Sequence, residues 1–214
     1  NMKYTYIIWD WNGTIVDDAQ LCVDIVNQHL KNFKIKEVSL DYYLNNFRFP
    51  VSSYYDQVGL PTDLESLNKI SSEFINKYRK LYKVCNIHSG ANACFEKLRS
   101  VGIYQSVLSA SMESDLLSFI LHFKLDHYFE NISGVGDFFA SGKSNISHDH
   151  LKKLNTDKSK VLLIGDTLHD AEIAQNLEID CLLFSGGHNS VEILTESDFP
   201  IVGTFDEICN YVLD

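Results

Sequence analysis

The sequence predicts an α/β protein with a doubly wound, Rossmann-like parallel sheet and an inserted helical cap domain. Three observations carry this prediction. Short apolar runs of strand composition alternate with stretches whose apolar residues recur at helical spacing. Several of these runs stop abruptly at polar residues, as the run 4–9 does at Asp10. Between the first strand and the others lies a long stretch of helical character. We therefore expect a core of residues 1–16 and 87–214 and a cap of residues 17–86.

Two helices are predicted within the cap. The first begins after Asp17 or Asp18, either of which is a plausible N-cap. The stretch 39–60 is rich in tyrosine and predicts irregular structure. The second helix begins at Thr62-x-x-Glu65, which has the pattern of a capping box.

From His88 onward, strands and helices alternate, which is typical of a parallel sheet with helices on its faces. We expect strands at 104–108, 130–135, 161–164 and 181–184. We expect helices at 90–100, ended by Gly102, then one starting at Lys143 and one capped by Thr204-x-x-Glu207.

Composition narrows the class of protein. The chain has 214 residues, of which 45% are apolar, and 18 Lys+Arg against 29 Asp+Glu give a net charge of −11. This charge disfavours nucleic acid and anionic membranes as partners and suits a protein that binds a cation. The five cysteines are odd in number and lack a C-x-x-C pair, so we expect a reduced, cytoplasmic protein. No apolar run approaches membrane-spanning length, the first run meets Asp10 too early for a signal peptide, and no pattern predicts an oligomeric state.

Polar side chains gather at the predicted ends of several strands. Because the carboxyl ends of parallel strands share one edge of a sheet, we expect these side chains to meet there although they are distant in sequence. They are Asp10, Asn12 and Thr14 after the first strand, Ser109 and Ala110 after the second, Lys143 before the long buried strand, and Asp166, Thr167 and Asp170 after it.

The chemistry that such a set permits is narrow. Asp10, Asp166 and Asp170 repel one another unless a cation lies among them. Oxygen ligands without His or Cys favour Mg²⁺ over Zn²⁺. Together with the Lys143 ammonium and the Ser109 hydroxyl, such an ion would form a cradle for phosphate. A carboxylate inside this cradle can attack phosphorus and form an aspartyl-phosphate.

These residues resemble the four motifs of the haloacid dehalogenase (HAD) superfamily of phosphohydrolases, in its phosphoglycolate-phosphatase-like branch. The motifs are Asp10–Thr14, Ser109, Lys143 and Gly165–Asp170, in that order. The resemblance implies that Asp10 is the nucleophile and a Mg²⁺ ligand, that the backbone carbonyl of Asn12 and the Asp166 carboxylate are further ligands, and that Asp170 holds the waters of the metal. It also implies that Ser109 and Lys143 hold the phosphoryl group of a small phosphorylated metabolite. Thr14 and Ala110 complete the predicted substrate contacts, and Arg48 is a candidate contact from the cap to an anionic tail of the substrate.

Asn12 departs from the family pattern. Family phosphatases have Asp two residues after the nucleophile, where it protonates the leaving oxygen and later activates water; a carboxamide cannot move a proton. Losing general acid–base catalysis costs about 10²–10⁴-fold in rate. Three interpretations follow: a phosphatase that is slow or restricted to good leaving groups, a phosphatase in which another group supplies the proton, and a non-catalytic phospholigand binder or regulator. An Asp→Asn substitution introduced as a trap is a fourth.

Other signals point to weaker hypotheses. Gly142-Lys143-Ser144 resembles part of a P-loop, but the upstream Gly136 has the wrong spacing. A dehalogenase would not need the Asp166–Asp170 pair, and a phosphosugar mutase would need the missing Asp. We expect His148 and His150 at the surface, and His169 and His188 at the rim of the site, with His169 a candidate for the missing acid.

Overall fold

The structure is a computed structural model that describes residues 1–136 and 142–214 of the chain. Within these residues lies one six-stranded parallel sheet of order β3-β2-β1-β4-β5-β6, so that the first strand is central. This order is that of a doubly wound sheet and confirms the predicted fold class. The strands are β1 (Tyr6–Trp9), β2 (Tyr104–Met112), β3 (Asn131–Val135), β4 (Val161–Gly165), β5 (Asp180–Phe184) and β6 (Ile201–Val202).

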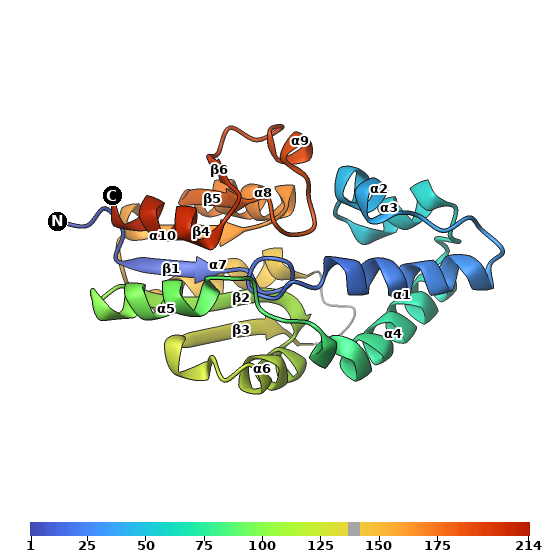
Figure 1. Cartoon of the computed structure of the whole chain (residues 1–214), viewed down its shortest axis with the longest axis horizontal. Coiled ribbons are helices and arrows are strands. Elements are labelled where there is room, and N and C mark those ends of the chain that lie inside the picture. Colours follow the sequence, from blue (N-terminus) through green and yellow to red (C-terminus); the bar gives the residue numbers. More distant parts are fainter. Residues whose placement is uncertain (137–141) are drawn as a thin grey trace.

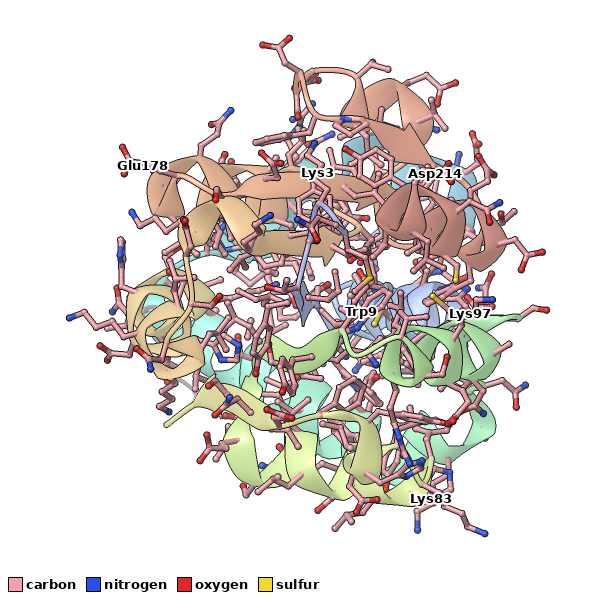
Figure 2. All side chains as sticks on the ribbon, turned by 90° about the vertical axis from the view of Figure 1, so that its left-hand side faces the viewer. Lys3, Trp9, Lys83, Lys97, Glu178 and Asp214 are labelled. Atoms are coloured by element: carbon pink, nitrogen blue, oxygen red, sulfur yellow. The ribbon has the colours of Figure 1, made fainter. Side chains whose placement is uncertain are left out.

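Helices cover both faces of the sheet. Side chains of β1 alternate between the faces, because successive residues of a strand point in opposite directions. Ile7 and Trp9 enter the core under α5 (Ala91–Ser100), α6 (Glu113–His122) and α10 (Phe205–Leu213), whereas Tyr6 and Ile8 enter the core under α7 (Lys143–Leu154) and α8 (Leu168–Leu177). In Figure 2, Trp9 lies near the middle of the view, whereas Glu178 lies near its outline. The remaining elements of this part are η2 (Asp126–Tyr128), η3 (Lys158–Lys160) and α9 (Val191–Leu194).

Four helices connect β1 to the rest of the sheet and have an apolar core of their own. They are α1 (Ala19–Asn32), α2 (Leu40–Asn46), α3 (Val51–Val58) and α4 (Leu64–Leu81), and η1 (Tyr82–Val84) follows them. In Figure 1 they lie to one side of the sheet, at the end toward which the β1 arrow points, while both termini lie at the opposite end. The carboxyl ends of the strands therefore face these helices.

The stretch 39–60 is helical, which corrects the expectation of irregular structure. Ser39 caps α2 by accepting a hydrogen bond from the backbone N–H of Tyr42, and Pro50 precedes α3. Most of the tyrosines that obscured the pattern are core residues: Tyr43, for example, is 3% exposed. Aromatic packing between short helices thus overrides weak helix propensity here.

Local boundaries differ from the prediction at two places. The cap of α4 is Asp63, which accepts from the N–H of Ser66, and not Thr62. Strand β2 continues past Leu108 to Met112, with a shift in its pairing to β3. The predicted cap of α10 at Thr204 is confirmed. Among the described residues, no helix is long and apolar enough to cross a membrane, and all five cysteines are free.

His150 is fully buried, which corrects the expectation of a surface position, whereas His148 is exposed as expected. The ring of His150 lies on α7 and contacts the hydroxyls of Ser133 (2.7 Å) and Ser106 (2.9 Å), both on strands. His148 and His150 are two residues apart and therefore point to different faces of the helix, and only the contacts with the strands tell which of the two is buried. Burial, followed by the charges of nearby lysines, lowers the pKa of His150 to about 4.

We expect this histidine to make the fold sensitive to acid. The unfolded chain takes up a proton near its ordinary pKa of 6.5, but the folded protein does so only near 4. Stability is therefore fully present above pH 6.5 and falls, by up to about 3 kcal/mol, as the pH drops toward 4. Unfolding free energies measured by denaturant between pH 4 and 8 should show a shallower acid loss for His150→Gln than for the wild type. His148→Gln is the matched control, and an equal acid loss in all three proteins would contradict the assignment.

Candidate active site

The loop after β1 holds Asp10 at the carboxyl edge of the sheet. The backbone N–H of Asp10 donates to the carbonyl of Ile164 in β4 (2.9 Å), which ties the loop to the neighbouring strand. Gly13 has a φ of +82°, and a side chain there would collide with the carboxylate of Asp166 and the ring of His188. A glycine at this position therefore lets the chain turn directly against the acidic residues of the next loop.

The predicted acidic residues converge. One carboxylate oxygen from each of Asp10, Asp166 and Asp170 lies within 4.8 Å of the others. The hydroxyl of Thr14 contacts both Asp10 Oδ2 (3.2 Å) and Asp166 Oδ1 (2.9 Å). Asp170 Oδ2 accepts from the backbone N–H groups of Asp166 and Thr167, at 3.1 Å each, which fixes it at the start of α8.

Lys143 lies between two of these carboxylates. Its ammonium donates to Asp10 Oδ1 at 2.8 Å and to Asp170 Oδ1 at 2.5 Å, and its side chain is almost fully buried. Burial alone would lower the pKa of Lys143, but the two carboxylates raise it above its ordinary value. Lys143 therefore stays charged within the cluster.

One lysine does not balance three buried carboxylates. Burial favours the neutral form of Asp10, but the charge and hydrogen bond of Lys143 hold the pKa of Asp10 below its usual range. Burial and then the charge of Asp10 raise the pKa of Asp166 well above its usual range. A divalent cation between Asp10 and Asp166 would remove this conflict, and the oxygen-only donor set fits Mg²⁺.

The remaining predicted substrate contacts are divided between the cavity and its surroundings. Ala110 lines the cavity beside Asp10, whereas Ser109 is buried and its hydroxyl accepts from the N–H of Ser111 (3.1 Å). Arg48 lies outside the cavity: its guanidinium forms two hydrogen bonds with Glu196, at 2.6 and 3.0 Å. This exposed ion pair joins the helical segment to the loop after α9, so the interpretation of Arg48 as a substrate contact is not supported by its position.

The side chain of Asn12 is held by three hydrogen-bond partners. Its Nδ2 donates to Asp18 Oδ2 (3.0 Å) and to the hydroxyl of Tyr78 (3.1 Å), and its Oδ1 accepts from Ser111 (3.0 Å). Tyr78 also donates to Asp18 at 2.7 Å. Asp18 begins α1 as expected, but its carboxylate turns away from the helix end and into this network.

His188 was expected at the rim and lies inside the site. Its Nε2 contacts Asp18 Oδ1 (2.8 Å), its Nδ1 contacts the Tyr43 hydroxyl (2.5 Å), and its backbone N–H donates to Asp166 (2.7 Å). Burial would lower the pKa of His188, but the charge of Asp18 raises it above its ordinary value, which favours a protonated ring beside the buried carboxylate. His188 follows the end of β5, so the strand-end rule applied to the other strands would have found it.

A cavity of about 340 Å³ opens above these residues, between the sheet edge and the helical segment. Asp10, Asn12, Lys143 and Asp166 line its base, and aromatic side chains of α2 to α4 line much of its wall. His169 also lines it and stacks on Phe49 at 4.7 Å.

The fold and this site define a class of protein: a doubly wound α/β protein with an acidic, cation-compatible centre at the carboxyl edge of its parallel sheet. The model of the family of haloacid dehalogenase-like hydrolases matches residues 7–184. The chain belongs to this family, and the resemblance predicted from the four motifs is confirmed.

Individual proteins are similar to this chain at low sequence identity. Tyrosine-protein kinase PtkA of Mycobacterium tuberculosis is 22% identical over 211 residues, which cover 94% of this chain and 70% of PtkA. Phosphoglycolate phosphatase of Rhodobacter capsulatus is 21% identical over 192 residues, 87% of each chain. A crystal structure described as a predicted phosphatase from Clostridium acetobutylicum shares the fold, with a TM-score of 0.85, 22% identity and 98% of each chain covered.

Proposed function

We propose that this protein is a Mg²⁺-dependent phosphatase of small phosphorylated metabolites that acts through an aspartyl-phosphate. The convergence of Asp10, Asp166, Asp170 and Lys143 on one point of the cavity base is the observation that carries the proposal. Membership of a hydrolase family and the phosphatases among the similar proteins support it.

In this proposal the ion would be held by the carboxylates of Asp10 and Asp166 and by the backbone carbonyl of Asn12, with Asp170 beside them. When bound, it supplies positive charge that offsets the charge of the phosphoryl oxygens. Lys143 supplies a second positive charge at the same place. Ser109 and Thr14 hold the loops that carry these groups and stand next to the phosphoryl position.

Asp10 is the proposed nucleophile. One of its carboxylate oxygens forms a bond to phosphorus while the bond from phosphorus to the ester oxygen breaks. Water then attacks the phosphorus of the aspartyl-phosphate, which releases phosphate and restores Asp10. Asn12 can neither protonate the leaving ester oxygen nor take a proton from the attacking water, because its carboxamide does not ionise at neutral pH.

In this proposal the helical segment is a cap domain that lies over a core domain of residues 1–16 and 87–214. It covers the cavity and excludes water during reaction, and it opens to admit the substrate. The name of the Rhodobacter protein suggests phosphoglycolate or a compound of similar size. We also infer a cytoplasmic location, where the five cysteines would stay reduced.

We expect Mg²⁺ to stabilise the protein through this site. A ligand that binds only the folded state at about 100 times its Kd adds about 2.7 kcal/mol to the free energy of unfolding. Thermal unfolding should therefore shift upward with Mg²⁺ in the wild type and much less in Asp166→Asn. Asp149→Asn removes an exposed carboxylate from α7 and is the matched control.

The same samples test the reaction. Phosphate release from a panel of phosphomonoesters should require Mg²⁺ and stop when the ion is removed by a chelator. Equal thermal shifts in the wild type and Asp166→Asn would contradict the metal site. Mg²⁺-dependent binding of phosphate without hydrolysis of any ester would favour the non-catalytic phospholigand binder.

A further inference from the structure

The wall of the cavity is aromatic. Residues from α2 to α4 and from α6 surround the space above Asp10, and burial in such a space favours an apolar, flat group. The aromatic lining residues are Tyr43, Phe47, Phe49, Tyr54, Tyr55, Phe74, Tyr78 and Phe119.

The wall carries little positive charge for a second anionic group. Among the described lining residues, the lysines and arginines are Lys143 and Arg79. Lys143 lies between two carboxylates at the base. Arg79 Nε donates to both carboxylate oxygens of Asp115, at 2.9 and 3.0 Å, so an acidic residue of the same wall balances its charge. A substrate whose body carries a carboxylate, as phosphoglycolate does, would have to compete with Asp115 for this guanidinium.

Asn12 restricts the leaving group, and this restriction also favours an aromatic ester. It cannot protonate the ester oxygen, so the oxygen must leave as an anion. A phenol has a pKa of about 10, as tyrosine does, whereas the pKa of an alkyl alcohol is several units higher, close to that of water. A phenolate is less basic than an alkoxide by several orders of magnitude, and it is therefore the better leaving group.

From these observations we propose that the substrate is an aryl phosphate, whose ring lies against the aromatic wall and whose phosphoryl group lies at Asp10. The inference rests on the proposed function and names an aryl ester as its substrate class, in place of the phosphoglycolate that the name of the Rhodobacter protein suggests. When Asp10 bonds to phosphorus, the bond from phosphorus to the phenolic oxygen breaks. The electron pair stays on that oxygen, which takes a proton from solvent after release.

Three phosphomonoesters test what the ring, the leaving oxygen and the tail of the substrate contribute to turnover. Phenyl and cyclohexyl phosphate have similar size, but only the first has a flat ring and a weakly basic leaving oxygen. Phosphoglycolate has an anionic tail. We expect kcat/KM for phenyl phosphate, with saturating Mg²⁺, to exceed the values for both other esters by at least about 100-fold. Comparable or higher values for cyclohexyl phosphate or phosphoglycolate would overturn the inference and leave the proposed function standing.

A variant of the wall tests where the ring binds. Phe74 lines the cavity and stacks on Tyr78 (6.2 Å between ring centres), so Phe74→Ala should raise KM for phenyl phosphate at least about fivefold. Phe33→Ala removes an exposed aromatic side chain outside the cavity lining and is the control. A KM that is unchanged in Phe74→Ala would contradict the assignment of the ring to this wall.

Binding measured without turnover keeps the two proposals distinguishable. Calorimetric titration of Asp10→Asn protein with phenyl phosphate and with phosphoglycolate should show at least tenfold tighter binding of phenyl phosphate. If the wild type hydrolysed none of the esters, the proposed function would fail, and this titration would decide the inference alone. Tighter binding of phosphoglycolate would overturn it.

Discussion

Replacing Asp10 with asparagine is expected to lower kcat/KM for the best phosphomonoester by at least about 10⁴-fold. An amide oxygen carries no negative charge and does not form the acyl phosphate that water then hydrolyses, so the nucleophile is lost outright. The substitution is conservative in shape, because the amide oxygen can still accept the hydrogen bond that Lys143 now gives to Asp10 at 2.8 Å. We therefore expect the loss to appear in kcat with little change in fold.

The measurement is phosphate release at saturating Mg²⁺, with thermal unfolding as the check on folding. Saturating ion is needed because Asp10 is also a proposed ligand. Asp149→Asn, which changes an exposed carboxylate of α7, should keep wild-type activity.

The P-loop hypothesis predicts the opposite pattern. Hydrolysis of ATP that survives in Asp10→Asn but is lost in Lys143→Ala would assign the chemistry to the Gly142–Ser144 segment. The positions of the residues argue against this outcome, because the Lys143 ammonium is held between Asp10 and Asp170.

The base of the site could be predicted from the sequence because it obeys a rule of topology. Asp10 and Asp166 follow short apolar runs with the composition of buried strands, and parallel strands place such residues at one edge. A single sequence contains this information locally: the run, its end and the residue type. Lys143 was found in the same way, as the first residue of a helix beside that edge.

The rule can point to His188 after β5, but it cannot predict the contacts in the upper part of the site. The contact of His188 with Asp18 joins residues separated by 170 positions, and the role of Tyr78 depends on how α4 packs over the loop after β1. No local pattern specifies either contact. Arg48 was a candidate contact to an anionic tail of the substrate, but its guanidinium pairs at the surface with Glu196, a residue distant in sequence that no local pattern points to.

Asn12→Asp is expected to raise the hydrolysis of alkyl phosphates by at least tenfold, and by up to about 10⁴-fold if full acid–base catalysis returns. The new carboxyl would replace an amide nitrogen that lies 3.0 Å from Asp18 Oδ2. Two carboxyl groups at this separation disfavour a second negative charge, so the neighbouring Asp18 should raise the pKa of the new Asp. A raised pKa keeps the group protonated near neutral pH, which suits an acid that must protonate a leaving alkoxide.

The substitution should also change the time course. In the wild type an aryl phosphate can form the aspartyl-phosphate without an acid, but no base at position 12 activates water for the second step. Rapid mixing should then show a burst of about one phenol per enzyme, followed by a slower steady rate. In Asn12→Asp the burst should shrink, because hydrolysis of the intermediate becomes faster than its formation.

The ratio of the turnover rates of phenyl and cyclohexyl phosphate shows how the substitution acts on a weakly basic and a strongly basic leaving group. It should fall in Asn12→Asp, since a general acid helps the more basic leaving group most. Asn12→Ser is a suitable control, because it removes the amide without adding a carboxyl group and should not accelerate either ester. Equal rates of wild type and Asn12→Asp on alkyl phosphates, with Mg²⁺ saturating, would show that proton transfer at this position does not limit the reaction and that another group, such as His169 at the cavity wall, supplies the proton.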